Sequence, residues 1–388
     1  MLNIIYYAWF ILIILSIGMP LTYYQYMIYR SKEPWNLGES NYADVAVGFI
    51  IPTYNEENTI LYKLMNFKKL KYPKNLINLI IVDSNSNDGT IKYVKEFQDE
   101  NPDINITIII EKERKGKAHA LNMALENVNS KYVIISDSDC FIPEDSIKKS
   151  LKYFTIKDIA AVAGNEKLVN VNDNWITKNE QLYKDNILKI RTGESKVHST
   201  ICFEGGYAIY RKEFLEEFDE VTGVDDSGTA LNIVQRGKRT IIAPDVFFYT
   251  TFPTTLSEKY LIKTRRARHL ITLWKKSVKL YLRNELKLPS IILIPETYLH
   301  LINPYVFTLL MLNTLYISLE RPVLFVLYLT VLLIPSTRYL TLELIMNNLI
   351  LLYSNFLHFS GKNITIWKKS EESRKLLDLN YLYKENLI

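Results

Sequence analysis

The sequence predicts an α/β protein with a mostly parallel sheet, helices on both faces of that sheet, and transmembrane helices on either side of this domain. Three observations predict it. Short apolar runs of strand length alternate with helical patterns through the middle of the chain, and polar motifs follow the ends of those runs. Long apolar runs lie toward both ends of the chain.

Composition narrows the class of protein. Of 388 residues, 48% are hydrophobic and 23% are charged, which is ordinary globular usage and argues against disorder. The balance of 47 Lys and Arg against 42 Asp and Glu gives a net charge of +5, too little by itself to indicate nucleic-acid binding, and we expect no nucleic-acid partner. Two cysteines exclude a disulfide framework and a Cys-x-x-Cys zinc site.

The first predicted element is an N-terminal transmembrane helix within residues 1–30. Residues 4–28 contain no Asp, Glu, Lys or Arg, and about 20 apolar residues are enough to cross a bilayer. A secretory signal peptide is the alternative, but its basic start, shorter apolar core and cleavage site are not apparent. Arg30 and Lys32 follow at once, so the positive-inside rule places the next domain in the cytoplasm.

A second membrane-directed region is expected at residues 291–360. Its candidate crossings are 300–319 and 322–341, whereas 342–359 carries polar residues and is either a further span or a helix lying at the interface. Basic residues in the tail, 361–388, indicate that this tail is cytoplasmic. Because the middle domain and the tail are then both cytoplasmic, the number of crossings between them must be even. We therefore expect two spans and one interfacial or re-entrant segment in this region. The predicted location is the cell membrane, with several crossings.

The central domain, residues 40–250, alternates strand and helix patterns. Strands that are apolar on both faces and separated by amphipathic helices indicate a parallel sheet covered on both sides. Ligands of such sheets bind at the carboxyl ends of the strands, where the polar motifs of this chain stand. The expected strands are 45–51, 77–82, 106–110 and 132–136, and the expected helices carry Ile60, Ile91, Leu121 and Ala230.

Asp137 and Asp139 follow the fourth expected strand, separated by one serine. Two carboxylates at this spacing on an irregular turn can converge on one hard divalent cation, and Mg²⁺ or Mn²⁺ prefers such oxygen ligands. An Asp-x-Asp triplet taken alone is more often a solvated turn. Its place at a strand end, on the same edge as the acidic loop that begins at Asp83, favours a metal site. That loop can accept hydrogen bonds from a ribose or a base, or cap the next helix.

Two further motifs carry charge at expected helix starts. Lys115 and Lys117 flank a glycine, and such a turn can hold a phosphate with the help of free backbone N–H groups, although it is more often only solvated. Asp225 and Asp226 precede an apolar helical pattern. Adjacent carboxylates suit general-base catalysis, in which one removes a proton from a hydroxyl group and the other orients it, although an acidic helix cap is the alternative.

Residues 251–290 form a basic amphipathic segment. One interpretation is a helix that lies on anionic membrane lipids. The other is capture of a diphosphate, because guanidinium groups pair well with phosphate oxygens. Both interpretations hold if different residues of the helix face each way. The arginines in question are Arg265, Arg266 and Arg268.

Six motifs in this order resemble glycosyltransferase family 2. They are the Pro-Thr-Tyr-Asn-Glu run at 52–56, IVDSNSNDGT, GKAHALN, SDSD, EGGYAIYRKEFL and VDDSGTALNIVQRGKRT. The resemblance covers about residues 45–275 and implies the GT-A fold, a Rossmann-like domain that binds a nucleotide-sugar. The flanking apolar runs suit the membrane branch that is similar to hyaluronan, chitin and cellulose synthases and to polyprenyl-linked sugar transferases.

The resemblance implies a role for each matching residue. Asp139, together with Asp137, would ligate Mg²⁺ or Mn²⁺. Asp226, supported by Asp225, would be the catalytic general base. The residues implied in binding are Pro52, Thr53, Glu56, Asp83, Lys117 and Asp137 for the nucleotide-sugar, Arg265, Arg266 and Arg268 for its diphosphate, and Gly205 and Gly206, which allow close approach, for the acceptor.

The implied activity is inverting, metal-dependent transfer of a sugar, with a UDP-sugar favoured as donor. Processive members carry Gln-x-x-Arg-Trp, whereas this chain has Lys263 in place of the glutamine and Ala267 in place of the tryptophan. That tryptophan helps to hold the end of a growing polymer, so we expect transfer to a lipid-linked or membrane-proximal glycan acceptor. The alternatives are a processive polysaccharide synthase and, more remotely, a catalytically silent scaffold that binds nucleotide-sugars.

Overall fold

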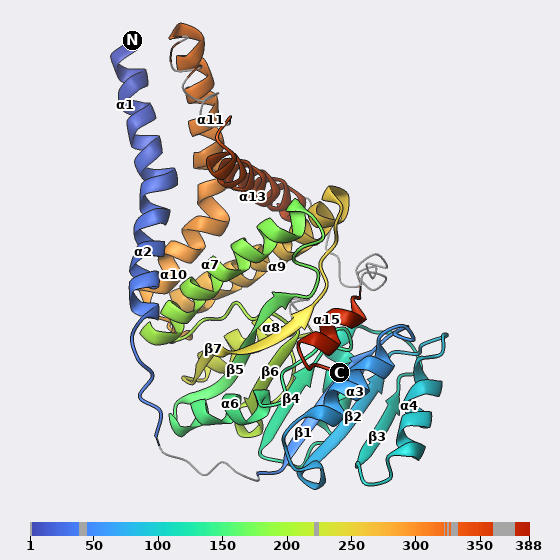
Figure 1. Cartoon of the computed structure of the whole chain (residues 1–388). Coiled ribbons are helices and arrows are strands. Elements are labelled where there is room, and N and C mark those ends of the chain that lie inside the picture. The colour runs from blue at the N-terminus through green and yellow to red at the C-terminus, as the bar shows by residue number, and fades with distance from the viewer. Residues whose placement is uncertain are drawn as a thin grey trace.

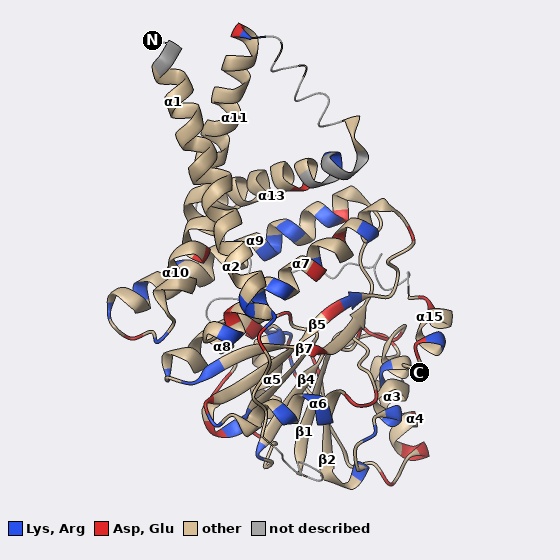
Figure 2. Cartoon of the chain, turned by 60° about the vertical axis from the view of Figure 1, so that its left-hand side comes forward, with Lys and Arg blue, Asp and Glu red and all other residues tan. Residues whose placement is uncertain are grey.

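The computed structural model describes residues 2–38, 45–220, 225–321, 323, 326, 333–359 and 377–388. A sheet domain lies at one end of the molecule, and two long helical rods rise away from it side by side (Figure 1). Helices α7 (Trp175–Val197), α9 (Leu256–Leu282) and α13 (Pro335–Phe359) lie between the sheet and the rods, and charged residues are sparse on the rods (Figure 2).

Each rod consists of consecutive helical elements. The two rods contact each other, and Nε1 of Trp9 donates a hydrogen bond of 2.8 Å to Oγ1 of Thr314. Among the residues described, Ile4–Ser31 and Ser290–Glu320 are the helices long and apolar enough to cross a membrane, judged by length and composition alone. The elements are α1 (Leu2–Ile13), a π-helical segment (Ile14–Gly18) and α2 (Met19–Ser31) in the first rod, and α10 (Ser290–Thr297), a π-helical segment (Tyr298–Ile302) and α11 (Asn303–Glu320) in the second.

The C-terminal helices differ from the expected arrangement. The second rod begins earlier than the expected span 300–319. Most of the first half of the expected span 322–341 lies outside the described residues. Helix α13 (Pro335–Phe359) covers the expected segment 342–359, lies crosswise to α11 and packs along α9 (Figure 1). Two helices of spanning length do not establish the multi-pass arrangement that the sequence predicts.

The sheet has seven strands in the order β3-β2-β1-β4-β6-β5-β7. Strand β1 pairs in parallel with β2 and β4, β2 with β3, and β5 with β7, whereas β6 runs antiparallel to both of its neighbours. The sheet is therefore mixed, and its parallel first part agrees with the expected strands. The strands are β1 (Val47–Thr53), β2 (Ile77–Asp83), β3 (Ile106–Ile110), β4 (Tyr132–Ser136), β5 (Ile159–Leu168), β6 (Tyr207–Arg211) and β7 (Arg239–Thr250).

Helices cover both faces of the sheet, as the sequence predicts. Successive strand residues point to opposite faces, so Ile50 and Ile80 pack into the core beneath α5 and α8, while Phe49 and Leu79 pack into the core beneath α3 and α4. The remaining helices are α3 (Ile60–Lys69), α4 (Thr90–Glu100), α5 (Lys117–Leu125), α6 (Ser146–Lys152), α7 (Trp175–Val197), α8 (Asp225–Gln235), α9 (Leu256–Leu282) and α15 (Leu379–Lys384).

The end of the described chain returns to the sheet domain. Helix α15 lies beside α3 (Figure 1), and Leu382 and Leu387 are buried together with Phe141. Nδ2 of Asn66 on α3 donates a hydrogen bond of 2.7 Å to the carbonyl oxygen of Leu387. The part of the expected tail 361–388 that the structure describes is thus packed against the sheet domain.

Candidate active site

Two turns with defined local geometry meet at the carboxyl edge of the sheet. Strand β4 ends at Ser136 and the chain turns at once, because the N–H of Cys140 donates to the carbonyl oxygen of Asp137 at 3.1 Å. Helix α5 begins at Lys117, directly after Gly116, whose φ of 119° is a conformation that residues with a side chain rarely adopt. The glycine therefore allows the tight entry that aims Lys117 at the turn after β4.

Asp225 and Asp226 stand opposite this turn. They occupy the first turn of α8, where the positive end of the helix dipole favours carboxylates. The ammonium of Lys117 lies among the acids, with Nζ 2.9 Å from Oδ1 of Asp137, 3.2 Å from Oδ2 of Asp225 and 3.9 Å from Oδ2 of Asp226. We call Asp137, Asp139, Asp225 and Asp226 the acidic centre.

Burial dominates the protonation chemistry of the acidic centre. It raises the pKa of Asp226 to about 8, and the charge of Asp225 adds to this shift. It also raises the pKa of Asp137 to about 6, opposed by Lys117 and reinforced by Asp139. Burial disfavours the charged form of Lys117, but the surrounding carboxylates hold its pKa well above the ordinary value. A carboxyl group with a pKa near neutrality suits a general base.

The Asp137–Asp139 turn fits a hard divalent cation. The ligand atoms of Asp137, Asp139 and Cys140 lie within 4.8 Å of one another. Burial raises the pKa of the Cys140 thiol well above its usual value, so the thiol stays protonated, with Sγ 3.6 Å from Oδ1 of Asp139. The ligands on offer are therefore carboxylate oxygens, which Mg²⁺ and Mn²⁺ prefer. Asp137 and Asp139 would hold such a cation.

Gly205 brings the backbone against the acidic centre. A Cβ atom at this position would lie 2.2 Å from Oδ2 of Asp226 and 3.0 Å from Nζ of Lys117. A Cβ atom on Gly206 would instead lie 2.1 Å from a ring carbon of the buried Phe248. Of the two glycines predicted for the acceptor site, the first contacts the acidic centre and the second serves packing.

The three arginines of α9 have different charged neighbours. Burial, together with the charge of Arg266, lowers the pKa of Arg265 to about 10, and acids of the acidic centre oppose this shift, so Arg265 lies within electrostatic range of them. Arg266 donates a hydrogen bond of 3.3 Å to Oε2 of Glu166. Arg268 lies within electrostatic range both of His269 and of His358 on α13. The structure thus places Arg265 within electrostatic range of the acidic centre and engages Arg266 in an ion pair with Glu166.

The ion pair of Arg266 belongs to a larger network beneath the site. Nζ of Lys184 on α7 lies 2.6 Å from Oε2 of Glu166 and 3.6 Å from Oε1 of Glu204, the residue before Gly205. Lys184 and Glu166 are almost fully buried. This network joins α7 and α9 to the loop that approaches the acidic centre.

The predicted nucleotide-binding residues lie at the ends of β1 and β2. Thr53 and Asp83 are register partners, and Oγ1 of Thr53 donates to Oδ1 of Asp83 at 2.9 Å. Asp83 is 1% exposed and also accepts hydrogen bonds from the N–H and hydroxyl of Ser86, at 2.8 and 2.6 Å. The Glu56 carboxylate accepts a hydrogen bond of 2.7 Å from the hydroxyl of Thr59, the residue before α3. Pro52 is half-buried in β1. These contacts favour a role for Thr53, Glu56 and Asp83 in shaping the loops.

Two further groups lie beside the site, and sequence reasoning missed the first of them. Lys63 of α3 is fully buried behind the Asp137–Asp139 turn, and burial lowers its pKa to about 8. Burial, helped by the charge of Arg265, lowers the pKa of His269 to about 4, so that histidine is neutral at physiological pH. A signal for Lys63 was available, because it follows Ile60 by three residues and therefore shares the apolar helix face that the spacing predicts to be buried.

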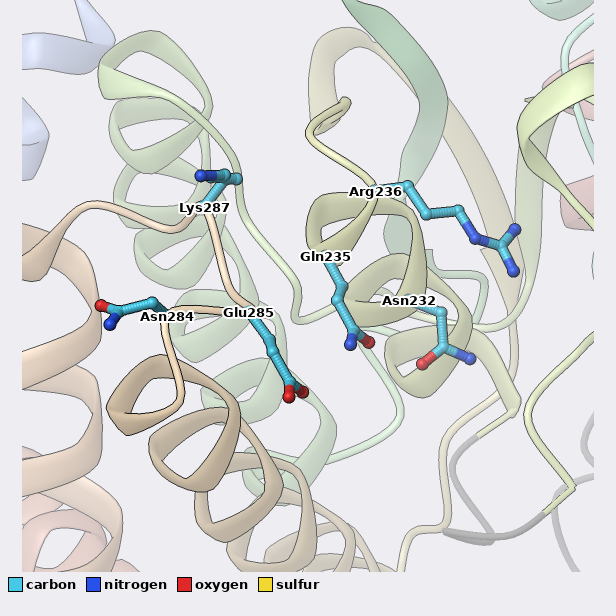
Figure 3. A pocket seen from close by; sticks show the side chains of 6 residues that line it. All are labelled: Asn232, Gln235, Arg236, Asn284, Glu285 and Lys287. Atoms are coloured by element: carbon cyan, nitrogen blue, oxygen red, sulfur yellow. The ribbon is translucent and has the colours of Figure 1, made fainter.

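A polar cavity of about 610 Å³ lies away from these groups, between α8 and the turn that follows α9 (Figure 3). Asn232, Gln235 and Arg236 line it from the side of α8. Asn284, Glu285 and Lys287 line it from the turn after α9. None of the predicted site residues lines this cavity.

Residues 49–219 of the chain match the family described as Glycosyl transferase family 2. This match identifies residues 49–219 as a family 2 glycosyltransferase domain, so the family resemblance of the sequence is confirmed for this part of the chain. The matched range begins within β1 and ends just before α8. It therefore includes the turn after β4 and the loop that carries Gly205 and Gly206.

The relatives include polymer synthases and a lipid-linked sugar transferase. A hyaluronan synthase of Streptococcus pyogenes is 28% identical over 181 residues, which are 46% of this chain and 43% of the synthase. A dolichyl N-acetyl-α-D-glucosaminyl phosphate 3-β-D-2,3-diacetamido-2,3-dideoxy-β-D-glucuronosyltransferase of Methanococcus voltae is 25% identical over 229 residues, which are 56% of this chain and 70% of that protein. The match thus spans less than half the length of the synthase.

One solved structure is similar along nearly the whole chain. The mannosyltransferase PcManGT from Pyrobaculum calidifontis, in complex with GDP-Man and Mn²⁺, has a TM-score of 0.77 and 28% sequence identity. The similarity covers 92% of this chain and 100% of that chain. The predicted GT-A fold is therefore confirmed.

Proposed function

We propose that this chain is an inverting, metal-dependent glycosyltransferase that moves a sugar from a nucleotide-sugar to a lipid-linked or membrane-proximal glycan acceptor. The acidic centre carries the proposal, because it combines a carboxylate pair fit for a cation with a second pair fit for a base. Lys117 joins the two pairs, at 2.9 Å from Asp137 and 3.2 Å from Asp225. A sugar seated between them would have its leaving group near the first pair and its acceptor near the second.

The donor end of the site stabilises the negative charge of the leaving diphosphate. A bound Mg²⁺ or Mn²⁺, held by Asp137 and Asp139, would supply positive charge beside the leaving diphosphate. Lys117 and Arg265 stabilise the charge that builds on the diphosphate oxygens as the glycosidic bond breaks. Thr53 and Asp83 fix the loops on which the nucleotide lies, through their mutual hydrogen bond of 2.9 Å.

The acceptor end of the site takes up the proton of the acceptor hydroxyl. Asp226 removes the proton from an acceptor hydroxyl while the hydroxyl oxygen forms its bond to the anomeric carbon. The bond from that carbon to the diphosphate oxygen breaks, and the nucleoside diphosphate leaves with the electron pair. Asp225 keeps the acceptor hydroxyl oriented, and Gly205, which has no side chain, lets the backbone lie against Oδ2 of Asp226 and hold that carboxylate in place. One displacement from the opposite face inverts the anomeric centre.

The helical rods and the relatives support an acceptor at a membrane. Ile4–Ser31 and Ser290–Glu320 have the length and composition of membrane crossings. The Methanococcus voltae relative acts, by its name, on a dolichyl-phosphate-linked sugar. We therefore infer that the sheet domain works on the cytoplasmic side of the cell membrane, where the basic helix α9 and a lipid-linked acceptor meet.

Transfer of one or a few sugars is favoured over processive synthesis. The names of the hyaluronan synthase and of a poly-β-1,6-N-acetyl-D-glucosamine synthase of Staphylococcus aureus make a polymer product the second candidate. Ala267, however, stands where processive members carry tryptophan, and it is only 4% exposed, so that position is packed inside the protein. A side chain at this position does not reach out to hold the end of a polymer.

The test is a donor panel with product sizing. Detergent-purified full-length protein in lipid extract receives labelled GDP-mannose, UDP-N-acetylglucosamine, UDP-glucose or UDP-galactose with Mn²⁺ or Mg²⁺. We expect nucleoside diphosphate release and a short product that organic solvent extracts. A long water-soluble polymer would establish the processive alternative. Pyrophosphate release would indicate nucleotidyl transfer, and no turnover of any donor, with Asp226→Asn indistinguishable from wild type, would contradict the proposal.

A further inference from the structure

The cation-binding turn is held from behind by a buried lysine. Lys63 projects from α3 and is 0% exposed. Its Nζ donates a hydrogen bond of 2.6 Å to Oγ of Ser136 and a second one to the carbonyl oxygen of Cys140. These two partners immediately precede and follow the Asp137–Asp139 triplet.

Burying this ammonium is costly unless the surroundings compensate its charge. No carboxylate in the described part of the chain forms an ion pair with it, and the acids whose charges favour its ionised form include Asp137 and Asp139. A methionine or leucine at position 63 would fill the same space in the core between α3 and the sheet without that cost. A plain packing role therefore does not explain the lysine.

The contacts of Lys63 extend to the acceptor side of the site. Oγ of Ser136, which accepts a hydrogen bond from Lys63, itself donates a hydrogen bond of 3.1 Å to the carbonyl oxygen of Gly206. The N–H of Asp137 donates to the same carbonyl oxygen at 3.3 Å. Gly206 follows the glycine that lies against Asp226. One ammonium group thus anchors the turn that bears both candidate metal ligands and, through one hydroxyl, the loop beside the base.

We propose that Lys63 is a positioning residue for the divalent cation: by bonding to Ser136 and Cys140 it fixes the turn so that Asp137 and Asp139 converge. This inference rests on the proposed function, which assigns the cation to those two acids. Groups that orient metal ligands typically change metal affinity by about 10- to 100-fold when they are removed.

Asn66 provides a matched control. It is on the same helix, 1% exposed, and also bonds to the chain after β4, through Nδ2 to the carbonyl oxygen of Ile142 at 2.9 Å and through Oδ1 to its N–H at 3.0 Å. These bonds lie beyond the flanks of the triplet. Loss of Asn66 therefore weakens the packing of the same segment without releasing the two carboxylates.

The experiment measures nucleotide binding without turnover. Binding of GDP and, in parallel, of UDP to the detergent-purified full chain is followed by calorimetry at a series of free Mn²⁺ concentrations. For Lys63→Met we expect the half-saturating Mn²⁺ concentration to rise about tenfold, equivalent to ~1.4 kcal/mol. Ser136→Ala, which keeps the ammonium and loses one anchor, is expected to show a smaller rise. Asn66→Ser is expected to stay within twofold of wild type while its melting temperature falls.

Three results would overturn the proposal. A Lys63→Met variant that responds to Mn²⁺ like wild type would show that the anchor is not needed. A lower half-saturating concentration would show that the ammonium acts only as a charge that repels the cation. If wild type binds either nucleotide but without any Mn²⁺ dependence, the metal role of Asp137 and Asp139 fails, and this proposal fails with it. If wild type binds neither nucleotide, the proposed function itself fails.

Discussion

Replacing Gly205 by alanine separates catalysis from folding at this site. The added Cβ atom would lie 2.2 Å from Oδ2 of Asp226, whereas ordinary contacts begin at 3.4 Å, so the carboxylate oxygen has to move by 1.2 Å. The obstacle is the end of a short side chain, so the backbone can stay in place. A misplacement of about 1 Å at a catalytic group costs about 100-fold in rate, or ~2.7 kcal/mol of transition-state stabilisation.

The assay is donor turnover at saturating acceptor, paired with a thermal melt. For Gly205→Ala we expect kcat to fall about 100-fold while the melting temperature changes by less than about 2 °C. Gly206→Ala is the matched control, because its Cβ would collide at 2.1 Å with the buried ring of Phe248, and it is expected to lower the melting temperature strongly. A Gly205→Ala enzyme with wild-type kcat would refute the close approach of this loop to the base.

Three further predictions follow from the acidic centre and its arginine. Asp226→Asn is expected to lower turnover by at least about 100-fold. Burial raises the pKa of Asp226 from 3.8 to about 8, so the folded state loses stability as pH rises from about 4 to about 8 and the loss is complete above that range. Asp226→Asn should therefore melt about 2–4 °C higher at pH 8.5 for each kcal/mol gained, with no gain at pH 4. Arg265→Ala is expected to lower kcat/KM about 100-fold, and a variant with wild-type kcat/KM would contradict a role for this arginine at the diphosphate. EDTA is expected to abolish turnover and Mn²⁺ or Mg²⁺ to restore it, and turnover that persists in EDTA would exclude the metal.

The parallel half of the sheet could be predicted because its strands are short, mostly apolar runs. The runs expected at 77–82, 106–110 and 132–136 differ from the observed strands by at most one residue. Strand β5 begins with an apolar run but continues through Asn, Glu and Lys, and β7 contains Pro and Asp, so the sequence gives neither strand's full extent. The antiparallel β6 pairs with strands distant in sequence, and local patterning carries no information on that pairing.

The site residues that could be predicted are those that directly follow a strand or begin a helix. Asp137, Lys117, Asp225 and Asp226 lie together. The shared edge of the strands predicted the position of Asp137, whereas the family resemblance implied the other three. The ion pair of Arg266 with Glu166 could not be predicted from the spacing of one helix, because it depends on where β5 places that carboxylate. The anchoring lysine was missed because a charged residue on an apolar helix face is ordinarily assigned to solvent.

Product stereochemistry during donor turnover tests the account most directly. Proton NMR of the product formed from GDP-α-mannose or UDP-α-N-acetylglucosamine reports the anomeric configuration of the new glycosidic bond. We expect a β-configured product, nucleoside diphosphate released one-to-one with it, and at least about 100-fold less product from Asp226→Asn. An α-configured product, or equal turnover by Asp226→Asn, would contradict a single displacement driven by this base.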